Sequence, residues 1–385
     1  MKILVLHSRL SGYYVACLAR LRSASSGFKI VAKPNQKDAP FNGELLDSLG
    51  EIVNRESLSD LDLLQLANEF NPDAVLVAGW MDPGYVKLCR KLKAKGVLII
   101  SGCDTQWKGS MRQYVASAIA PWHVQKFIDV LWVSGERQRQ LAARLGYTGA
   151  NCWDGYYACD WDLFSAKANE RFQGVGRGNA MNGNAGETEL RSDNTQPSAL
   201  SPQVSTLSSQ PSRSFCFVGR YVPAKGLDTL GEAYQIYSSQ VEQPWRLICA
   251  GKGVCRDVLL TAGAEDRGFI QPQDLPDFFL QADCFILPSR YEPWGVVVQE
   301  AAATGLPLIV SEACGAGVHL LRDRWNGRSF AAGEVAQLAE TMLWMHQQSN
   351  AQLHTMGRNS LELSKQYTPE RWVQTFVNGV ARKCG

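Results

Sequence analysis

Two glutamates beside an expected helix start are the residues of this sequence best suited to chemistry. Glu292 and Glu300 stand eight positions apart, with Pro293 and Gly295 between them. If the whole interval were helical, the two residues would lie about 12 Å apart along the axis. This separation is close to the reach from the sugar to the ribose of a sugar nucleotide, with the diphosphate between them. The pair therefore indicates an elongated anionic ligand.

Two basic residues follow another expected strand and complement the glutamates. Arg220 and Lys225 stand in a loop that contains Pro223, and this loop leads to the same edge of the sheet as Glu292. Two cations beside a helix N-terminus make a diphosphate site, and in a group transfer they would stabilise the charge on the departing phosphate. Taken alone, the pair would be read as solvated loop charges. Together with the two glutamates, it favours the diphosphate site.

The surrounding elements explain why these residues should meet. The apolar runs 284–287 and 306–310 are typical of buried parallel strands, and 296–304 predicts a short helix ended by Gly305. A strand–loop–helix junction in an α/β sheet points free backbone N–H groups beyond the strand ends, where anions bind readily.

A glycine turn after another apolar run gives a weaker indication of a nucleotide. Residues 247–253 lead into Gly251 and Gly253, but Arg256 stands where a dinucleotide-binding motif would have its third glycine. The sequence has no G-x-x-x-x-G-K-[ST] phosphate loop. The turn fits a backbone approach to a nucleotide, and the pattern argues against an NTPase.

Apolar runs alternate with helical patterns along most of the chain, which predicts parallel βαβ units. A segment at 173–214 differs, because it is rich in Gly, Asn, Ser, Gln and Pro and has no aromatic residue. We expect an α/β domain at 1–165, a low-complexity, disordered linker or insertion at 166–213, and a second α/β domain at 214–366. We expect a terminal helix at 367–385, which packs back on the first domain. The expected strands are 3–7, 73–78, 97–101, 130–134, 214–219, 245–250, 284–288 and 307–311, with a helix at 135–145.

Composition excludes some classes of site. The net charge of +2 indicates no particular partner. The eleven cysteines are scattered and include no C-x-x-C pair, and neither they nor the five histidines show the spacing of metal ligands. We therefore expect neither metal nor cofactor. A cysteine inside a strand behaves as a small hydrophobe, and a reducing cytoplasm fits this usage. No apolar run approaches the roughly 20 residues that span a bilayer.

The first half carries an excess of positive charge. Eleven Lys and Arg residues between 87 and 144 face only Asp82, Asp104, Asp129 and Glu136. This excess favours an anionic membrane surface or a phosphate-bearing acceptor. The alternative is a solvated, lysine-rich helix face at 87–95.

In this order and spacing, the motifs resemble the retaining glycosyltransferases of family 4. The resemblance covers the second domain at 218–226, 250–253, 269–276, 282–289, 292–300 and 326–327, and more loosely the first at 128–136 and 155–164. It implies the α/β GT-B fold, in which two Rossmann-like, doubly wound domains face a cleft. It also implies a retaining transfer that needs no metal.

The resemblance separates the roles of the residues. It implies that Glu292 contacts the transferred sugar, Glu300 the ribose hydroxyls, and Arg220 and Lys225 the diphosphate. The remaining donor-binding positions that it implies are Gly219, Trp294, Gly295, Val296, Gly251 and Gly253.

The acceptor side departs from the family pattern. Residues 101–107 contain no histidine where the family often has one, so Asp104 is the candidate polar group near the acceptor. The alternative for Asp104 is a helix N-cap. His7 could face the cleft, although a structural role is favoured. Trp80 and Tyr85 could stack on a sugar or simply pack, and the role of His319 in the altered loop 314–319 stays open.

The expected activity is transfer of a hexose from a UDP- or GDP-sugar to a hydroxyl of a glycan, lipid-linked or small-molecule acceptor. The setting would be polysaccharide or lipid-linked glycan synthesis, in the cytoplasm or peripherally at the inner membrane face through the basic first domain, without nucleic acid. The alternatives are a catalytically silent sugar-nucleotide-binding protein and a GT-B sugar-nucleotide epimerase.

Overall fold

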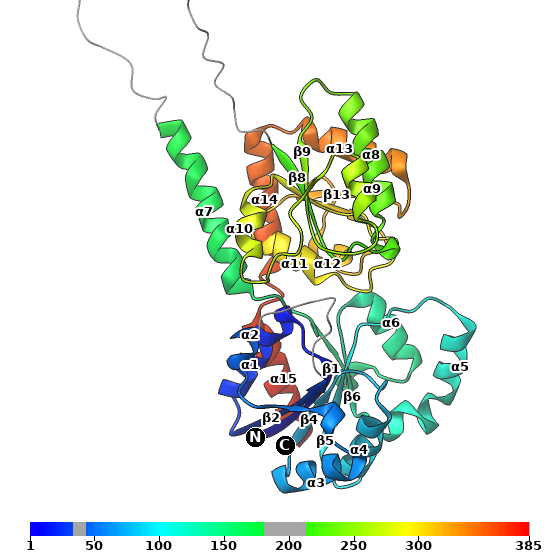
Figure 1. Ribbon diagram of the computed structural model, residues 1–385. Helices are drawn as coiled ribbons and strands as arrows, with labels where there is room; N and C mark the ends of the chain where they lie inside the picture. Colours follow the sequence, from blue (N-terminus) through cyan, green and yellow to red (C-terminus); the bar gives the residue numbers. More distant parts are fainter. Residues whose placement is uncertain (34–43, 181–212, 385) are drawn as a thin grey trace, which may run out of the picture.

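The computed structural model describes residues 1–33, 44–180 and 213–384, and these form two α/β domains (Figure 1). The first domain has a seven-stranded sheet in the order β3-β2-β1-β4-β5-β6-β7, and the second a six-stranded sheet in the order β10-β9-β8-β11-β12-β13. The paired strands are parallel in both sheets. Strand order reverses beside β1 in the first sheet and beside β8 in the second. Both domains are therefore doubly wound, as the sequence predicted.

The first domain contains the strands β1 (Lys2–Arg9), β2 (Gly27–Lys33), β3 (Ile52–Asn54), β4 (Ala74–Val77), β5 (Leu98–Cys103), β6 (Val130–Val133) and β7 (Cys152–Asp154). Its helices are α1 (Gly12–Ser23), α2 (Glu44–Asp47), α3 (Asp60–Phe70), α4 (Pro83–Lys93), α5 (Met111–Ile119) and α6 (Glu136–Arg144). The predicted strands and the helix at 135–145 are confirmed.

The second domain contains the strands β8 (Ser214–Val218), β9 (Arg246–Ala250), β10 (Glu265–Asp266), β11 (Cys284–Leu287), β12 (Leu308–Ser311) and β13 (Gly327–Phe330). Its helices are α8 (Leu227–Ser239), α9 (Arg256–Thr261), α10 (Leu275–Leu280), α11 (Val296–Ala303), α12 (Gly317–Leu320), α13 (Val335–His346) and α14 (Asn350–Ser364). Cys249 and Cys284 are fully buried in β9 and β11, as expected for small hydrophobes.

Helix α7 (Trp161–Ala180) leads from the first domain along the second (Figure 1). Phe164 packs in the core of the second domain, and the Arg171 guanidinium donates to the carbonyl oxygens of Phe279 and Ala282 at 2.7 and 2.9 Å. The linker predicted at 166–213 is therefore helical at 166–180, and Arg171 holds this part of α7 against the second domain. The rest of the predicted insertion, residues 181–212, lies outside the described residues.

The last helix, α15 (Pro369–Cys384), belongs to the first domain although it ends the chain. It lies beside α1, so that the two chain ends are close together in the lower domain of Figure 1. Trp372 stacks on Trp132 with ring centroids 4.5 Å apart, and its indole N–H donates to the carbonyl oxygen of Tyr156 at 2.7 Å. Through these contacts α15 packs against the first domain.

None of the helices in the described part of the chain is long and apolar enough to cross a lipid bilayer.

Candidate functional site

Lys225 and Glu292 form an ion pair at the reversal point of the second sheet. Lys225 ends the 3₁₀ turn Pro223–Lys225 after β8, and Glu292 lies in the loop after β11, the neighbouring strand. The Lys225 ammonium contacts Glu292 Oε2, and their side chains are only 14% and 13% exposed. The Ser289 hydroxyl also donates to Oε2, at 3.4 Å. The structure therefore brings together two residues that the sequence placed at one sheet edge.

Backbone hydrogen bonds fix the loops that carry this pair. The N–H of Arg290 donates to the carbonyl oxygen of Ala224 at 2.9 Å, which joins the Lys225 turn to the Glu292 loop. On the other side, the N–H of Gly315 donates to the carbonyl oxygen of Glu292 at 3.0 Å. A Cβ atom at Gly315 would meet the Pro293 carbonyl oxygen at 2.1 Å, so this approach requires glycine. The loop 314–319, which departs from the family pattern, thus supports Glu292.

The start of α11 presents a helix N-terminus beside Glu292. Its N-cap is Gly295, which has no side chain to satisfy the first-turn N–H groups. Trp294 is almost fully buried and packs between His319 and Tyr367, at ring distances of 5.4 and 5.5 Å. Its indole therefore anchors the loop, while the backbone of residues 294–296 forms the start of α11, where the sequence predicts that an anion binds.

Glu300 lies in the middle of α11 and is buried. Burial raises the pKa of its carboxyl to about 7. Burial also raises the pKa of the Tyr13 phenol, with smaller rises from the Asp104 and Glu300 carboxylates. Tyr13 belongs to α1, so Glu300 lies close enough to the first domain to contribute to the raised pKa of this phenol.

Arg220 and the glycine turn lie on the loops after β8 and β9. Arg220 is exposed. The N–H of Tyr221 donates to the carbonyl oxygen of Lys252 at 2.7 Å. A Cβ at Gly251 would meet the Gly219 carbonyl oxygen at 1.9 Å, and one at Gly253 the Tyr221 carbonyl oxygen at 2.3 Å. These glycines therefore allow the two loops to pack backbone on backbone, which was not apparent from the sequence.

The first domain has a cavity of about 680 Å³ at the carboxyl ends of β1, β4 and β5. Asp104, Trp80 and His7 line it, and Tyr291 contributes from the second domain. The Tyr157 hydroxyl donates to the Asp104 carboxylate at 3.2 Å. Asp104 is not an N-cap, because α5 begins at Met111 and is capped by Ser110.

Tyr85, close to this cavity, and His7, which lines it, both make contacts that hold the fold. The Tyr85 hydroxyl is buried and donates to the carbonyl oxygens of His7 and Val31 at 3.2 and 3.0 Å, so Tyr85 packs and does not stack on a sugar. Burial lowers the pKa of His7 to about 4. Its neutral ring accepts from the Arg9 N–H at 3.3 Å and packs on Tyr14.

The domains touch through several polar contacts that the sequence did not predict. His319 Nε2 accepts from the Glu136 N–H at 3.1 Å. The Gln138 side-chain amide donates to the carbonyl oxygens of Pro293 and Asp104, at 2.6 and 3.1 Å. Gln138 therefore links the Glu292 loop directly to the Asp104 loop.

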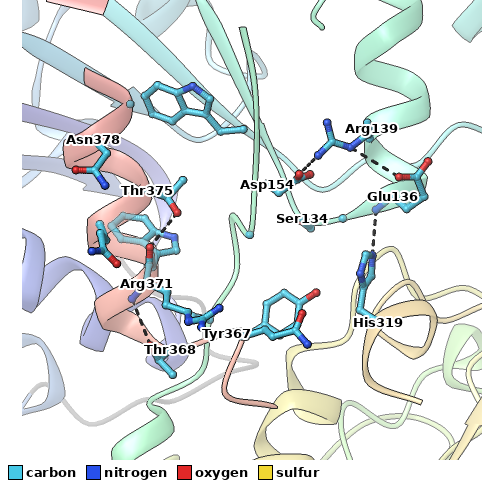
Figure 2. Close-up of a pocket in the computed structure, with 18 of the residues that line it drawn as sticks. Ser134, Glu136, Arg139, Asp154, His319, Tyr367, Thr368, Arg371, Thr375 and Asn378 are labelled. Atoms are coloured by element: carbon cyan, nitrogen blue, oxygen red, sulfur yellow. Dashed lines mark hydrogen bonds and ion pairs between the residues drawn. The ribbon is translucent and has the colours of Figure 1, made fainter. Parts of the chain in front are cut away.

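A second cavity, of about 690 Å³, lies between α6 and α15 (Figure 2). Arg139 pairs there with Asp154 and Glu136, and the His319 contact forms one wall. His319 comes from the second domain, so this cavity lies at the domain junction. Among the described residues, no group of three or more His, Cys, Asp or Glu side chains could hold a metal ion.

The second domain of this chain is similar to known glycosyltransferases. The family model for "Glycosyl transferases group 1" matches residues 204–362, which include Arg220, Lys225, Glu292 and Glu300. Mannosylfructose-phosphate synthase of Agrobacterium fabrum is 30% identical over 109 residues, covering 24% of this chain and 24% of that protein. Glycogen synthase of Mycobacterium tuberculosis is 36% identical over 101 residues, also 24% of each chain. The chain thus matches about a quarter of the length of these relatives.

Similarity of fold extends over the whole chain. The structure of HepE from Anabaena in complex with UDP has a TM-score of 0.70 and 15% identity, and covers 99% of this chain and 100% of that one. The same protein has also been solved with UDP-glucose. The structural neighbours are GT-B glycosyltransferases, and the two parallel-sheet domains described above have this fold.

Proposed function

We propose that this chain is a glycosyl transferase of group 1, the family whose model matches residues 204–362, and that it transfers a hexose from a UDP- or GDP-sugar to a hydroxyl acceptor, with retention of configuration. The observation that carries the proposal is the Lys225–Glu292 ion pair beside the N-terminus of α11. It puts a cation, a carboxylate and free backbone N–H groups where a sugar and its diphosphate would meet.

In this proposal the diphosphate lies against Lys225 and Arg220, and the nucleoside ribose is held by Glu300. The bond between C1 of the hexose and the phosphate oxygen breaks, and the acceptor oxygen bonds to C1 on the same face. The acceptor proton passes to the oxygen of the departing phosphate. Lys225, Arg220 and the amides of 294–296 stabilise the charge that builds on this phosphate, so no metal is required.

Glu292 is assigned to orientation of the sugar and not to nucleophilic attack. Its carboxylate is already engaged by the Lys225 ammonium and the Ser289 hydroxyl, which reduces its nucleophilicity. The acceptor enters from the cavity of the first domain, where Asp104 is held by Tyr157. Interdomain contacts such as Gln138 to Pro293 align the two halves and exclude water.

A panel of sugar nucleotides tests the proposal. The protein is incubated with UDP- and GDP-hexoses without and with acceptors, and release of UDP or GDP is measured. We expect turnover with one nucleotide class without added metal and in the presence of a chelator, and α-linked products from α-linked donors. Tight binding of UDP or GDP without turnover of any donor would instead identify a sugar-nucleotide-binding protein, and loss of turnover with the chelator would contradict metal independence.

A further inference from the structure

Helix α5 is unusual among the helices of the first domain because none of its residues is buried. Met111 is 77% exposed and Val115 56%, and Trp122 in the following 3₁₀ turn Ala120–Trp122 is 73% exposed. Tyr114 and Ile119 are exposed as well. This spacing puts them on one face of the helix. We call Met111, Tyr114, Val115, Ile119 and Trp122 the α5 face.

This face is not an ordinary solvated surface. A nine-residue helix is marginal in water unless an apolar face packs against something. The α5 face is instead turned outward, and α5 lies at the outer margin of the first domain (Figure 1). Large apolar groups gathered in this way mark an interaction surface.

The segment that carries the α5 face has charge of one sign. From residue 105 to residue 128 the sequence has no Asp or Glu, whereas it has Lys108, Arg112 and Lys126. Arg112 and Lys126 are exposed. Exposed Trp and aliphatic side chains together with Lys and Arg, without acidic residues, match the interfacial region of an anionic bilayer. A protein partner would not require that acidic residues be absent from residues 105–128.

The α5 face is continuous with the acceptor-side cavity. Ile119 belongs to both, and exposed Met81 stands at the cavity margin. Behind α5, Ala116, Val124, Leu141 and Leu145 give the cavity an apolar lining beside the polar Ser110, Arg112, Gln113 and His123, while Asp104 lies among the residues at the sheet edge. A ligand filling this cavity would thus have a polar end near the candidate site and an apolar remainder beneath α5.

We propose that the α5 face docks on an anionic lipid bilayer, and that the cavity beside it receives the apolar part of an amphiphilic acceptor. The acceptor hydroxyl then lies near Asp104, facing the donor. This inference deepens the proposed function and rests on it for the reaction, but not for membrane docking or amphiphile binding.

Docking is tested by co-sedimentation of the full chain with vesicles of phosphatidylcholine alone and of phosphatidylcholine with 30% phosphatidylglycerol (roughly the anionic fraction that polybasic surfaces sense). The variant Met111→Ser/Trp122→Ser removes two members of the α5 face. The matched control Leu61→Ser/Val254→Ser removes two side chains that are 76% and 84% exposed elsewhere. Lys126→Glu tests the contribution of charge.

We expect the wild type and the matched control to bind the anionic vesicles, and the α5 variant and Lys126→Glu to bind about tenfold more weakly. Added salt should weaken wild-type binding. No binding by the wild type, or equal binding by the α5 variant, would overturn docking. A concentration-dependent dimer that the α5 variant abolishes, without vesicle binding, would assign the face to a second copy.

The cavity is tested by calorimetric titration with octyl glucoside below its critical micelle concentration and with methyl glucoside. We expect heat of binding only with octyl glucoside, and its loss in Ala116→Trp, which fills the cavity. Absence of octyl glucoside binding, or equal binding by Ala116→Trp, would overturn the amphiphilic acceptor. Donor hydrolysis by the same variants provides a separate readout. Its absence in the wild type would count against the proposed function alone. Circular dichroism shows whether Ala116→Trp is folded.

Discussion

Lys225 and Glu292 are ion-paired although they follow different strands, β8 and β11, and stand 67 positions apart in the sequence. The two strands are neighbours because strand order in the second sheet reverses between them. The strand order of the second sheet therefore brings the two residues together. The pair puts opposite charges beside the carboxyl ends of parallel strands and the N-terminus of α11.

Replacing Lys225 by Met should lower transfer by about 10²–10³-fold, since it removes a cation from the leaving phosphate and leaves Glu292 unpaired. The measurement is kcat/KM with saturating acceptor. Lys365→Met is the matched control, because Lys365 pairs with Glu362 at 2.5 Å on an exposed helix surface. A similar loss in both variants would show a general effect and not a role at the site.

Glu292→Gln and Arg220→Ala should differ in how they affect binding and turnover. Glu292→Gln keeps the shape of the side chain but loses the charge toward the sugar, so transfer should fall far more than affinity for UDP or GDP. Arg220→Ala should weaken both, because the proposed function puts the guanidinium against the diphosphate in the ground state as well. Calorimetry of nucleotide binding beside steady-state rates distinguishes the two, and wild-type turnover in Glu292→Gln would refute its assignment.

Glu300 should make nucleotide-sugar binding pH-dependent. Burial raises its pKa to about 7 from an ordinary value of 4.5, so the free protein holds the proton at slightly acidic pH. In the proposed function, the ribose hydroxyls of the donor would donate to this carboxylate when it is ionised. Affinity for a sugar nucleotide should therefore rise as pH increases through about 7, by up to about tenfold per pH unit below that value. In Glu300→Gln this dependence should vanish.

The raised pKa of Glu300 should also make the free protein less stable as pH rises, which is opposite to its effect on nucleotide-sugar affinity. Because the folded state binds the Glu300 proton more tightly than the unfolded chain, the contribution is fully present below pH 4.5 and is lost as pH rises through about 7. Urea unfolding of the wild type and of Glu300→Gln over this range should therefore converge at low pH and diverge, in favour of the variant, at high pH. A constant difference would contradict the assigned cause.

His319 should stabilise the domain junction only when neutral. Burial lowers its pKa, and Nε2 accepts from the Glu136 N–H. This contribution is present above the ordinary pKa of 6.5 and is lost as pH falls through the lowered value. His319→Ala should lower the melting temperature near neutral pH. In this variant the melting temperature should also fall less as the pH is lowered. The exposed His123 gives the control variant, and an identical pH profile in both would contradict this role.

Trp372→Ala should cost about 3–5 kcal/mol of unfolding free energy, since it removes a buried indole that stacks on Trp132 and fixes α15. Urea denaturation measures the loss. Trp325, which is 44% exposed, provides the control, and its replacement by Ala should cost much less. Equal losses would show that α15 adds little to the first domain.

Much of the second domain could be predicted from the sequence because its function-bearing residues directly follow apolar strands. Cys284–Leu287 is completely buried, and the residues after it must reach the sheet edge. The edge strands β3, β7, β10 and β13 were missed since they are short or carry polar residues, and pairing with a neighbour decides their conformation. The inner strand β2 was missed as well.

The tertiary supports of the site could not be read from the sequence. Gly315 is required by the Pro293 carbonyl oxygen, and Gln138 is positioned by the opposite domain. Ser289 offered one signal, as the first hydroxyl after the Cys284–Leu287 strand. Helix α7 extends into the predicted linker, and its residues Phe164 and Arg171 anchor it to the second domain. These contacts could not be predicted from composition.

The most direct test of the central claim is a crystal structure of the protein with an intact UDP- or GDP-hexose. We predict that the diphosphate contacts Lys225, Arg220 and the start of α11, with the hexose against Glu292 and the ribose hydroxyls on Glu300. A donor bound in the reverse direction, with its nucleoside at Glu292, or a diphosphate bound away from Lys225, would contradict the account.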